Sequence, residues 1–226
     1  MELSLEALAA CGLALALAHL VKGITGFGSA LVSMPVLLSF LPPREAILLL
    51  VATDLITGAW LVKEVWPTLR MPLLAGLVGG ITAGQWVGTE LVVHLEPATL
   101  KALLGVVVAA MGARFVWRPV VAGRGELDHL PEPALPMILQ ATGAATVGGV
   151  LAGLVGAGGP PLVLWVRQHF ADQFARAHLL ATFQFGSITL MAMLLAKGTP
   201  ASTLLAVPLL LVPAVLGSRL GAWASP

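Results

Sequence analysis

Long apolar segments follow one another from one end of the chain to the other. They lie near residues 5–22, 29–41, 43–62, 71–93, 98–117, 134–155, 160–170, 174–196 and 201–224. Most approach the roughly 17–25 residues that a helix needs to cross a bilayer. Only 10% of the 226 residues are charged, against about 25% in a soluble domain, so too few polar residues exist to build a water-facing surface. The sequence therefore predicts an all-α, polytopic membrane protein.

Charge and cysteine content exclude several other classes. The formal net charge is +1, which gives no reason to expect a nucleic-acid partner. Cys11 is the single cysteine, so the chain forms no internal disulfide, and no Cys/His cluster has the spacing of a metal site. No nucleophile elbow, P-loop or paired His/Glu motif is present. We therefore expect no enzymatic activity, no catalytic residue, no metal and no cofactor.

Two of the apolar segments are short, and each follows a cluster of glycines. A helix over 29–41 is about 20 Å long, less than the roughly 30 Å of a hydrocarbon core, and 160–170 is shorter still. The sequence GITGFGS precedes the first of them and GLVGAGGPP precedes the second. Each cluster predicts a break after which a new helix begins inside the membrane.

The glycine clusters belong to an internal repeat. Three anchors recur in the same order at offsets of 130, 129 and 133 residues: Gly23, Gly26 and Gly28 with Gly153, Gly156 and Gly158; Leu49–Asp54 with His178–Phe183; and Gly84 and Gly88 with Gly217 and Gly221. The alternative is that Ala/Leu/Gly-rich sequences align by chance.

The repeat divides the chain into three parts. We expect a first transmembrane repeat over 1–117, a polar linker over 118–133, and a second transmembrane repeat over 134–226. The second repeat lacks a counterpart of the last helix of the first. A naturally short chain, a truncated chain and a face covered by a partner subunit all remain open.

The distribution of Lys and Arg favours a hairpin at each glycine cluster. With hairpins, eight of these residues share the side of the linker (Lys63, Arg70, Arg114, Arg118, Arg124, Arg167, Arg176 and Arg219), and three lie opposite (Arg44, Lys101 and Lys197). If only the short segments 29–41 and 160–170 are re-entrant, six of these Lys and Arg residues lie on one side of the membrane and five on the other. The positive-inside rule then places the N-terminus outside and the linker in the cytoplasm. The two halves become inverted repeats, an architecture common among transporters, with the site near the midplane.

A helix that begins inside the membrane can bind an anion. Its first N–H groups have no intrahelical partner and carry partial positive charge, and glycine allows a ligand close to the backbone. Ser29 is a candidate N-cap or ligand donor, and Pro160 and Pro161 suit a first helical turn. The substrate-binding candidates at the two breaks are Gly26, Phe27, Gly28, Ser29, Gly156, Ala157, Gly158 and Gly159. The alternative role for such glycines is close helix packing, which we prefer for Gly76, Gly80, Gly84 and Gly88.

Two charged residues lie in apolar segments: Lys22 precedes the first glycine break, and Asp54 lies at the centre of segment 43–62. A charge inside the bilayer usually faces a cavity or a partner. Lys22 and Asp54 can pair with each other, or Lys22 can attract the anion while Asp54 relays a proton; a purely structural pair and a Lys22 that reaches the interface remain open. Hydrogen bonds to the anion are expected from Thr25, Thr53, Thr182 and Gln184, although helix–helix hydrogen bonds are the alternative for each. His19 is a weaker candidate.

The two clusters resemble a motif of the sulfite exporter TauE/SafE-type transporters, roughly G-x-G-G-G-x-x-x-x-P-x-L once in each half. The first copy is Gly26-Phe27-Gly28-Ser29-Ala30 with Pro35 and Leu37, and the second is Gly156-Ala157-Gly158-Gly159 followed by Pro160, with Trp165 where the first copy has Pro35. The resemblance covers essentially the whole chain. It implies a multi-pass permease of the bacterial cytoplasmic membrane that moves sulfite or small sulfur-containing organic anions; some relatives are linked to sulfoacetate or other carboxylates.

From these patterns we expect a secondary transporter for a small oxyanion such as sulfite or a sulfonate. It would work by alternating access coupled to an ion gradient, with Lys22 and Asp54 as the charge- or proton-coupling residues. Its partners would be the anionic substrate and the lipid bilayer, and a homo-oligomer remains open. The alternatives are a passive channel for a small anion, and a non-transporting membrane enzyme or assembly partner.

Overall fold

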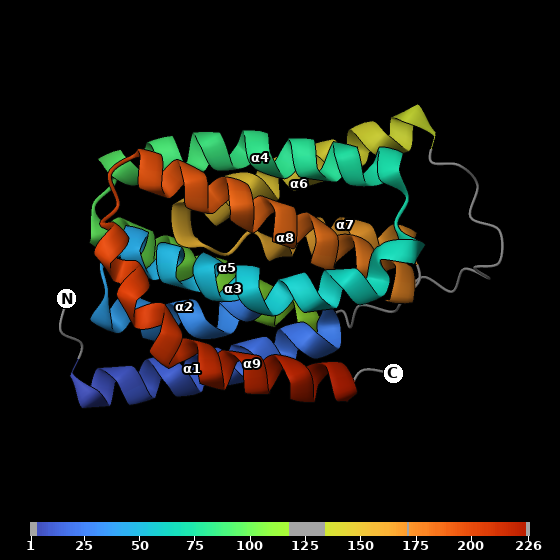
Figure 1. The fold of residues 1–226 in the computed structure, drawn as a ribbon. Helices are drawn as coiled ribbons and strands as arrows, with labels where there is room; N and C mark the ends of the chain where they lie inside the picture. Colours follow the sequence, from blue (N-terminus) through green and yellow to red (C-terminus); the bar gives the residue numbers. More distant parts are fainter. Residues whose placement is uncertain (1–3, 118–133, 171, 225–226) are drawn as a thin grey trace.

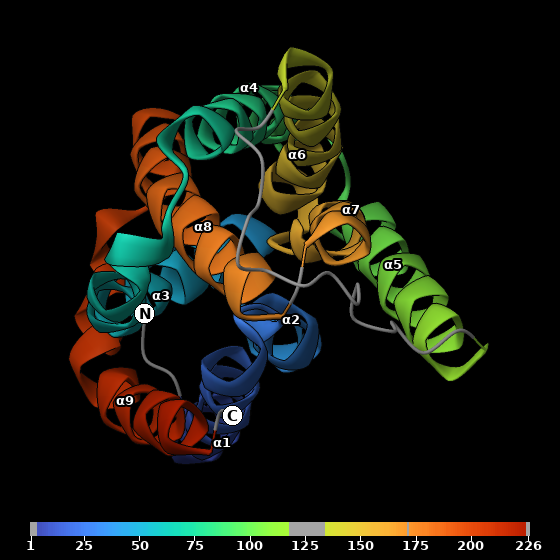
Figure 2. The same cartoon turned by 90° about the vertical axis from the view of Figure 1, so that its right-hand side faces the viewer.

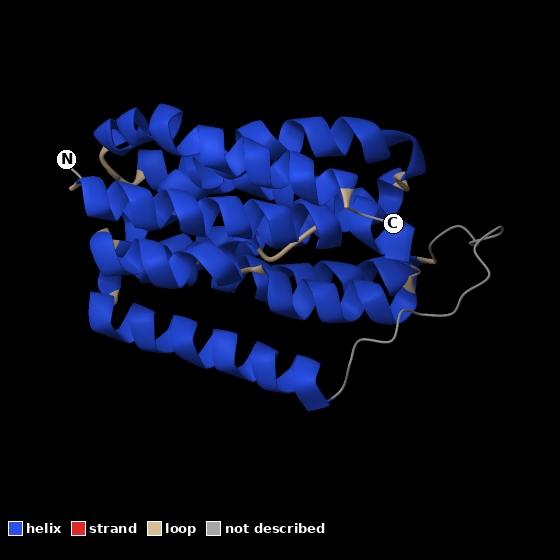
Figure 3. Ribbon diagram, turned by 90° about the horizontal axis from the view of Figure 1, so that it is seen from below, coloured by secondary structure: helices blue, strands red, loops and turns tan. Residues whose placement is uncertain are grey.

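The fold is a bundle of helices, seen here in a computed structural model that describes residues 4–117, 134–170 and 172–224. Within these ranges the chain is helical, and no strand is present (Figure 3). The elements in chain order are α1 (Leu5–Thr25), α2 (Ser29–Phe40), α3 (Pro43–Val65), η1 (Trp66–Thr68), α4 (Met71–His94), α5 (Pro97–Trp117), α6 (Leu135–Val155), α7 (Gly159–His169), α8 (Asp172–Ala196), η3 (Ala201–Ala206) and α9 (Val207–Trp223). The predicted all-α class is confirmed, while the predicted linker over 118–133 lies outside the described residues.

Within the described ranges, six helical segments are long and apolar enough to cross a membrane. They are Leu5–Thr25, Pro43–Thr68, Pro97–Arg114, Leu135–Val155, Gln173–Ala196 and Ala201–Trp223. The glycine-rich α4 has 24 residues but falls outside these six. The helices α2 and α7 have only 12 and 11 residues, so neither can cross a bilayer alone. The protein is therefore a polytopic membrane protein.

The two glycine breaks end their preceding helices in the same way. Gly26 follows α1 with φ 84° and Gly156 follows α6 with φ 74°, a left-handed conformation that glycine adopts without a steric cost. The starts of the next helices differ, because Gly28 before α2 has φ 98° whereas Gly158 before α7 has φ −78°. The repeat in sequence is therefore only partly a repeat in backbone conformation.

Each break turns the chain back toward the side from which it came. In Figure 1, α1 starts on the left and α2 returns to the left, whereas α6 starts on the right and α7 returns to the right. The tips of the two hairpins lie between these ends. The N- and C-terminal ends of the described chain lie on opposite sides of the bundle. The hairpins thus enter the bundle from opposite directions.

The long helices pack crosswise between the two halves. The most extensive contacts join α4 to α6 and α1 to α9. A Cβ on Gly153 of α6 would lie 2.8 Å from the carbonyl carbon of Gly88 on α4, and a Cβ on Gly23 of α1 would lie 2.8 Å from the Cα of Gly221 on α9. Gly23 and Gly153 therefore lie inside helices as packing residues, not in the breaks to which the sequence pattern assigned them.

A second pair of contacts repeats the same correspondence. A Cβ on Gly84 would overlap the carbonyl oxygen of Thr146, and one on Gly217 would overlap that of Ala16. Gly84 and Gly217 are related by the offset of 133 found in the sequence, and Ala16 and Thr146 by the offset of 130. The packing role preferred for the glycines of α4 is confirmed. Because equivalent glycines meet equivalent backbone atoms, the contacts support an internal repeat whose halves are interwoven.

The centre of the bundle is formed by α3 and α8, which pack against each other. Viewed along the bundle, they lie between the α4–α6 pair and the α1–α9 pair (Figure 2). Of the six candidate spans, α3 is the most buried, and residues Ile47–Leu50 are fully enclosed by neighbouring helices. Asp54 is one turn further along this buried helix, which places a carboxylate in the interior of the bundle.

Candidate functional site

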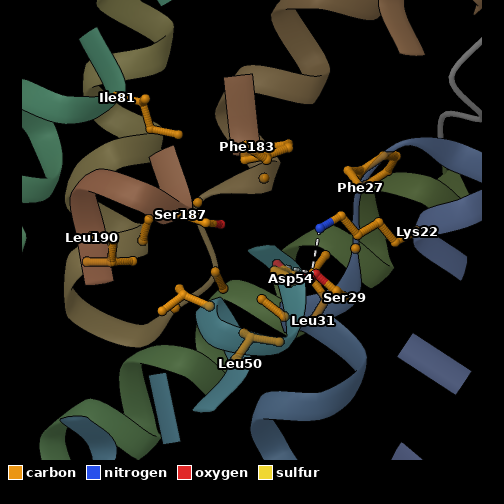
Figure 4. A pocket seen from close by; sticks show the side chains of 18 of the residues that line it. Lys22, Phe27, Ser29, Leu31, Leu50, Asp54, Ile81, Phe183, Ser187 and Leu190 are labelled. Carbon is orange, nitrogen blue, oxygen red and sulfur yellow. Dashed lines mark hydrogen bonds and ion pairs between the residues drawn. The ribbon is translucent and has the colours of Figure 1, made fainter. Parts of the chain in front are cut away.

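The two glycine breaks line a single internal cavity of about 50 Å³ (Figure 4). A water molecule needs roughly 10–15 Å³ of such space, so the cavity can hold a few waters or one small ion. The residues of the sequence-predicted set that line it are Lys22, Phe27, Gly28, Ser29, Asp54, Gly156, Ala157, Gly158 and Gly159. The structure therefore brings both breaks and both predicted charges to one place.

Three side chains converge on the carboxylate of Asp54. Lys22 Nζ lies 2.8 Å from Asp54 Oδ1, and His19 Nε2 lies 3.1 Å from the same oxygen. Ser29 Oγ donates a hydrogen bond to Asp54 Oδ2 at 3.1 Å. His19 and Lys22 are three residues apart on α1 and so share one face of that helix. His19 was a weaker candidate from the sequence, and the structure places it beside Lys22 and Asp54.

The charged cluster is almost completely buried. The exposed fraction is 0% for His19, 2% for Lys22 and 7% for Asp54. A single charge at the centre of a membrane helix costs about 3 kcal/mol on insertion scales, so buried charges are normally paired. The contacts of Lys22 Nζ and His19 Nε2 with Asp54 are short, but neither is aligned as a directed hydrogen bond. Lys22 therefore retains donor capacity that a second anion could use.

The N-terminus of α2 adds backbone donors beside Lys22. Gly28, not Ser29, occupies the N-cap position, and no side chain caps the helix. Ser29 is the first helical residue and directs its hydroxyl to Asp54, so the N-cap role considered for it is wrong. Ser29, Ala30 and Leu31 line the cavity, and N–H groups in a first helical turn have no intrahelical partner.

The N-terminus of α7 offers fewer donors than that of α2. Gly158 is its N-cap, and the helix continues with Gly159, Pro160 and Pro161. Proline has no N–H, so of these three helical residues only Gly159 has an N–H group to offer. The two breaks meet at the cavity as the inverted-repeat hypothesis requires, but they are chemically unequal.

Aromatic rings cover the cavity near the second break. Phe27 and Phe183 both line it. A Cβ on Gly159 would lie 3.5 Å from Cδ2 of Phe27, and the guanidinium carbon of Arg167 lies 5.7 Å from the centre of the Phe27 ring. Near the second break the cavity wall is therefore glycine backbone from the second half and aromatic rings from both halves.

Two polar residues that were not candidates from the sequence line the same cavity as Lys22. Gln85 on α4 and Ser187 on α8 line it, and Figure 4 shows Ser187 on the side opposite Lys22. Gln85 Oε1 accepts a hydrogen bond of 2.7 Å from Thr189. A glutamine within the otherwise apolar, glycine-rich α4 was the available sequence signal.

Five other predicted residues do not line the cavity: Thr25, Gly26, Thr53, Thr182 and Gln184. The Thr25 hydroxyl bonds the carbonyl oxygens of Val21 and Phe27, and that of Thr53 bonds the carbonyl oxygen of Leu50. Gln184 Nε2 donates to the carbonyl oxygen of Leu55. The Thr182 hydroxyl is buried without a hydrogen-bond partner.

Arg176 shapes the first break from outside the cavity. Its side chain packs against Gly26, and its Nη2 donates a 2.8 Å hydrogen bond to the carbonyl oxygen of Gly23. A cation at the last carbonyls of a helix is favourable because the C-terminal end carries partial negative charge.

Over the described part of the chain, no three His, Cys, Asp or Glu side chains lie close enough together to form a metal site.

Comparison with known proteins gives one family. Residues 11–226 match the family described as Sulfite exporter TauE/SafE. No curated protein and no solved structure matched the chain. The matched range contains both glycine breaks and every residue that lines the cavity. The chain belongs to the sulfite exporter TauE/SafE family.

Proposed function

We propose that the protein is a permease for small oxyanions, such as sulfite or short sulfonates, in a bacterial cytoplasmic membrane. The observation that carries this proposal is the position of the Lys22 ammonium and the N-terminus of α2 on one small buried cavity between the two breaks. An ammonium group and free backbone N–H groups are the donors that oxyanions bind in proteins. The family is one of membrane transporters, and transport is the function proposed rather than catalysis.

Alternating access is the mechanism we propose, with coupling to an ion gradient. The hairpins α1–α2 and α6–α7 enter the bundle from opposite directions, and both contribute to the cavity wall. Movement of one hairpin and its packed helices relative to the other would open the cavity to one side at a time, as in other inverted-repeat transporters.

We propose that the N-terminus is outside and the central linker cytoplasmic. Among the described residues, the helix ends at the linker side of the bundle carry Lys63, Arg70, Arg114, Arg167, Arg176 and Arg219, whereas the opposite ends carry Arg44, Lys101 and Lys197. Arg118 and Arg124, which the sequence argument also counts, lie outside the described residues. An excess of Lys and Arg is typical of the cytoplasmic side.

Counterflow in proteoliposomes tests the proposal. Vesicles loaded with unlabelled sulfite should accumulate labelled sulfite transiently, and the initial rate should saturate with concentration. A passive channel gives flux without counterflow and with little saturation. Correctly folded protein that moves no sulfite, sulfonate or small carboxylate would contradict transport altogether and favour the enzyme or assembly-partner alternatives.

Gly159→Val is the best single variant for locating the substrate. Its Cβ would lie in the cavity, with the nearest atom of Phe27 at 3.5 Å, and its φ is not in the left-handed region, so the added methyl groups fill the site rather than strain the backbone. Gly158 is less suitable because a Cβ there would lie 2.6 Å from the carbonyl oxygen of Gly148. We expect counterflow to fall at least tenfold in Gly159→Val. Gly79→Val, where a Cβ meets no atom within 4 Å, is the matched control.

A further inference from the structure

The buried cluster around Asp54 brings together one lysine, one imidazole and one carboxylate. We infer that each monovalent anion crosses with one proton, which is held between His19 and Asp54, and that the anion replaces Asp54 as the partner of Lys22. This inference rests on the proposed transport function and specifies how it is coupled.

Few charges act on Asp54. From α1 it faces His19 and Lys22, and from α2 it faces the neutral Ser29. The other described charges on the helices that pack against α1 and α3 are engaged elsewhere. Arg176 on α8 bonds the carbonyl oxygen of Gly23, and Arg219 on α9 lies 5.8 Å from the centre of the Trp60 ring. The charge of the site is therefore set by Lys22, Asp54 and His19.

The hydrogen bonding of His19 makes the His19–Asp54 pair a site for one proton. His19 Nδ1 lies 2.8 Å from the carbonyl oxygen of Leu15, which can only accept, so Nδ1 carries a hydrogen. In a neutral imidazole the other nitrogen, Nε2, then presents a lone pair. That nitrogen lies 3.1 Å from the carboxylate oxygen of Asp54. One proton between the two atoms turns the repulsion of two electron pairs into an attraction, whether it resides on the imidazole or on the carboxyl group.

Four occupancy states follow from these groups. Without anion and proton, Lys22 and Asp54 cancel and the net charge is zero. The proton alone makes the site positive, and a monovalent anion alone makes it negative. Anion and proton together return it to zero. A net charge buried in the membrane is costly, so the empty and the doubly loaded states are the ones that cross. These two states define a symporter, and its cycle moves no net charge.

The same groups explain why the anion needs the proton. Lys22 Nζ and Ser29 Oγ both contact Asp54, and both lie on the cavity wall beside the free N–H groups of α2. An anion in the cavity would use the donors that Asp54 now occupies. Neutralising the carboxylate releases Lys22 to the anion, so the binding of one favours the binding of the other.

Proton movement in the wild-type protein tests this directly. The probe is methanesulfonate, which keeps one negative charge throughout, so any proton that moves with it is carried by the protein. In proteoliposomes with a trapped pH dye, we expect about one proton per methanesulfonate, uptake driven by an acid exterior, and no response to a K⁺ diffusion potential. Uptake that responds to the potential and moves no protons would overturn the inference. If sulfite alone is transported, the same two gradients are applied to sulfite, and dependence on the potential again contradicts it.

Asp54→Asn gives a second, independent signature. The amide leaves Lys22 positive, so the site is neutral only when an anion is bound, and the empty site cannot return. We expect counterflow to persist within a few-fold while uptake driven by the pH gradient falls at least tenfold. Glu45→Gln, on the same helix and bonded to Thr203 at 3.0 Å, should keep both activities. Accumulation driven by the pH gradient in Asp54→Asn would contradict the inference.

The outcomes separate the two levels of the proposal. Absence of counterflow in the wild-type protein rejects transport itself. Counterflow without proton coupling leaves transport in place and rejects the symport. If Asp54→Asn does not fold, the proton count in the wild-type protein decides the matter.

Discussion

The guanidinium group of Arg167, near the end of α7, lies over the ring of Phe27 in the first break, with 5.7 Å between the guanidinium carbon and the ring centre. A residue of one hairpin thus holds an aromatic wall of the cavity that belongs to the other hairpin. Such a cation–π contact stabilises by about 0.5–2 kcal/mol, depending on its exposure to solvent. The size of the cavity therefore depends on both halves of the chain.

Phe27→Ala should broaden the range of transported anions. Removing the ring enlarges the cavity next to Gly159, so longer sulfonates should compete better against labelled sulfite, with a relative gain of several-fold. Competition in counterflow measures this. Phe40→Ala, which removes a ring with 45% of its surface exposed at the end of α2, should leave the ranking unchanged. An identical ranking in Phe27→Ala would show that the ring does not limit size.

Lys22→Gln should lower both stability and anion affinity. It leaves the carboxylate of Asp54 buried beside neutral groups, and the loss of one partner of a buried pair costs about 3–5 kcal/mol. The double variant Lys22→Gln/Asp54→Asn should recover most of the thermal stability but not the transport. Thermal unfolding in detergent and counterflow measure the two effects. Transport at the wild-type rate in the double variant would show that Lys22 does not bind the anion.

Valine substitutions at equivalent glycines in the two halves should lower the stability of the protein by similar amounts. Gly84→Val and Gly217→Val each force a side chain against a backbone carbonyl of the partner helix, which cannot move aside, and we expect each to lose about 1–3 kcal/mol of stability or more. Gly79→Val, in the same helix as Gly84 but facing open space, is the control. A large difference between the two destabilised variants would argue against equivalent packing.

His19→Gln should shift the pH dependence of uptake toward acid. In the symport inferred above, the imidazole helps hold the coupling proton next to Lys22, and without it the carboxyl group of Asp54 would have to hold the proton alone. Methanesulfonate uptake measured over a pH series should keep its maximum rate and move its midpoint to lower pH. A midpoint that stays in place would assign His19 a purely structural role.

The sequence predicted the class of fold, and offered a Lys22–Asp54 pair as one of several interpretations, for physical reasons that act locally. Membrane-spanning helices need long apolar runs, and Lys22 and Asp54 needed a partner wherever they lay in the membrane. Gly23 was assigned to the break because it lies next to Gly26 and Gly28 in the sequence. Its actual role, packing against α9, depends on a helix that is distant in the sequence, so no local pattern reveals it. Gln85 and Ser187 were missed because they meet the first break only through the three-dimensional packing of α4 and α8, which no local pattern records. His19 was within reach, since its spacing from Lys22 places both on one face of α1.

The two prolines that follow Gly159 make the N-termini of α2 and α7 chemically unequal. The first half holds the lysine, the carboxylate and a helix start rich in free N–H groups, while Pro160 and Pro161 remove most such groups from the second. The first half therefore supplies the charged groups at the cavity, while the shape of the cavity wall depends on both halves. If the cavity holds an anion as proposed, substitutions in the second half would resize its wall without altering Lys22 or the N-terminus of α2. The proposed anion site would in this way suit anions of different size while its charged half stays unchanged.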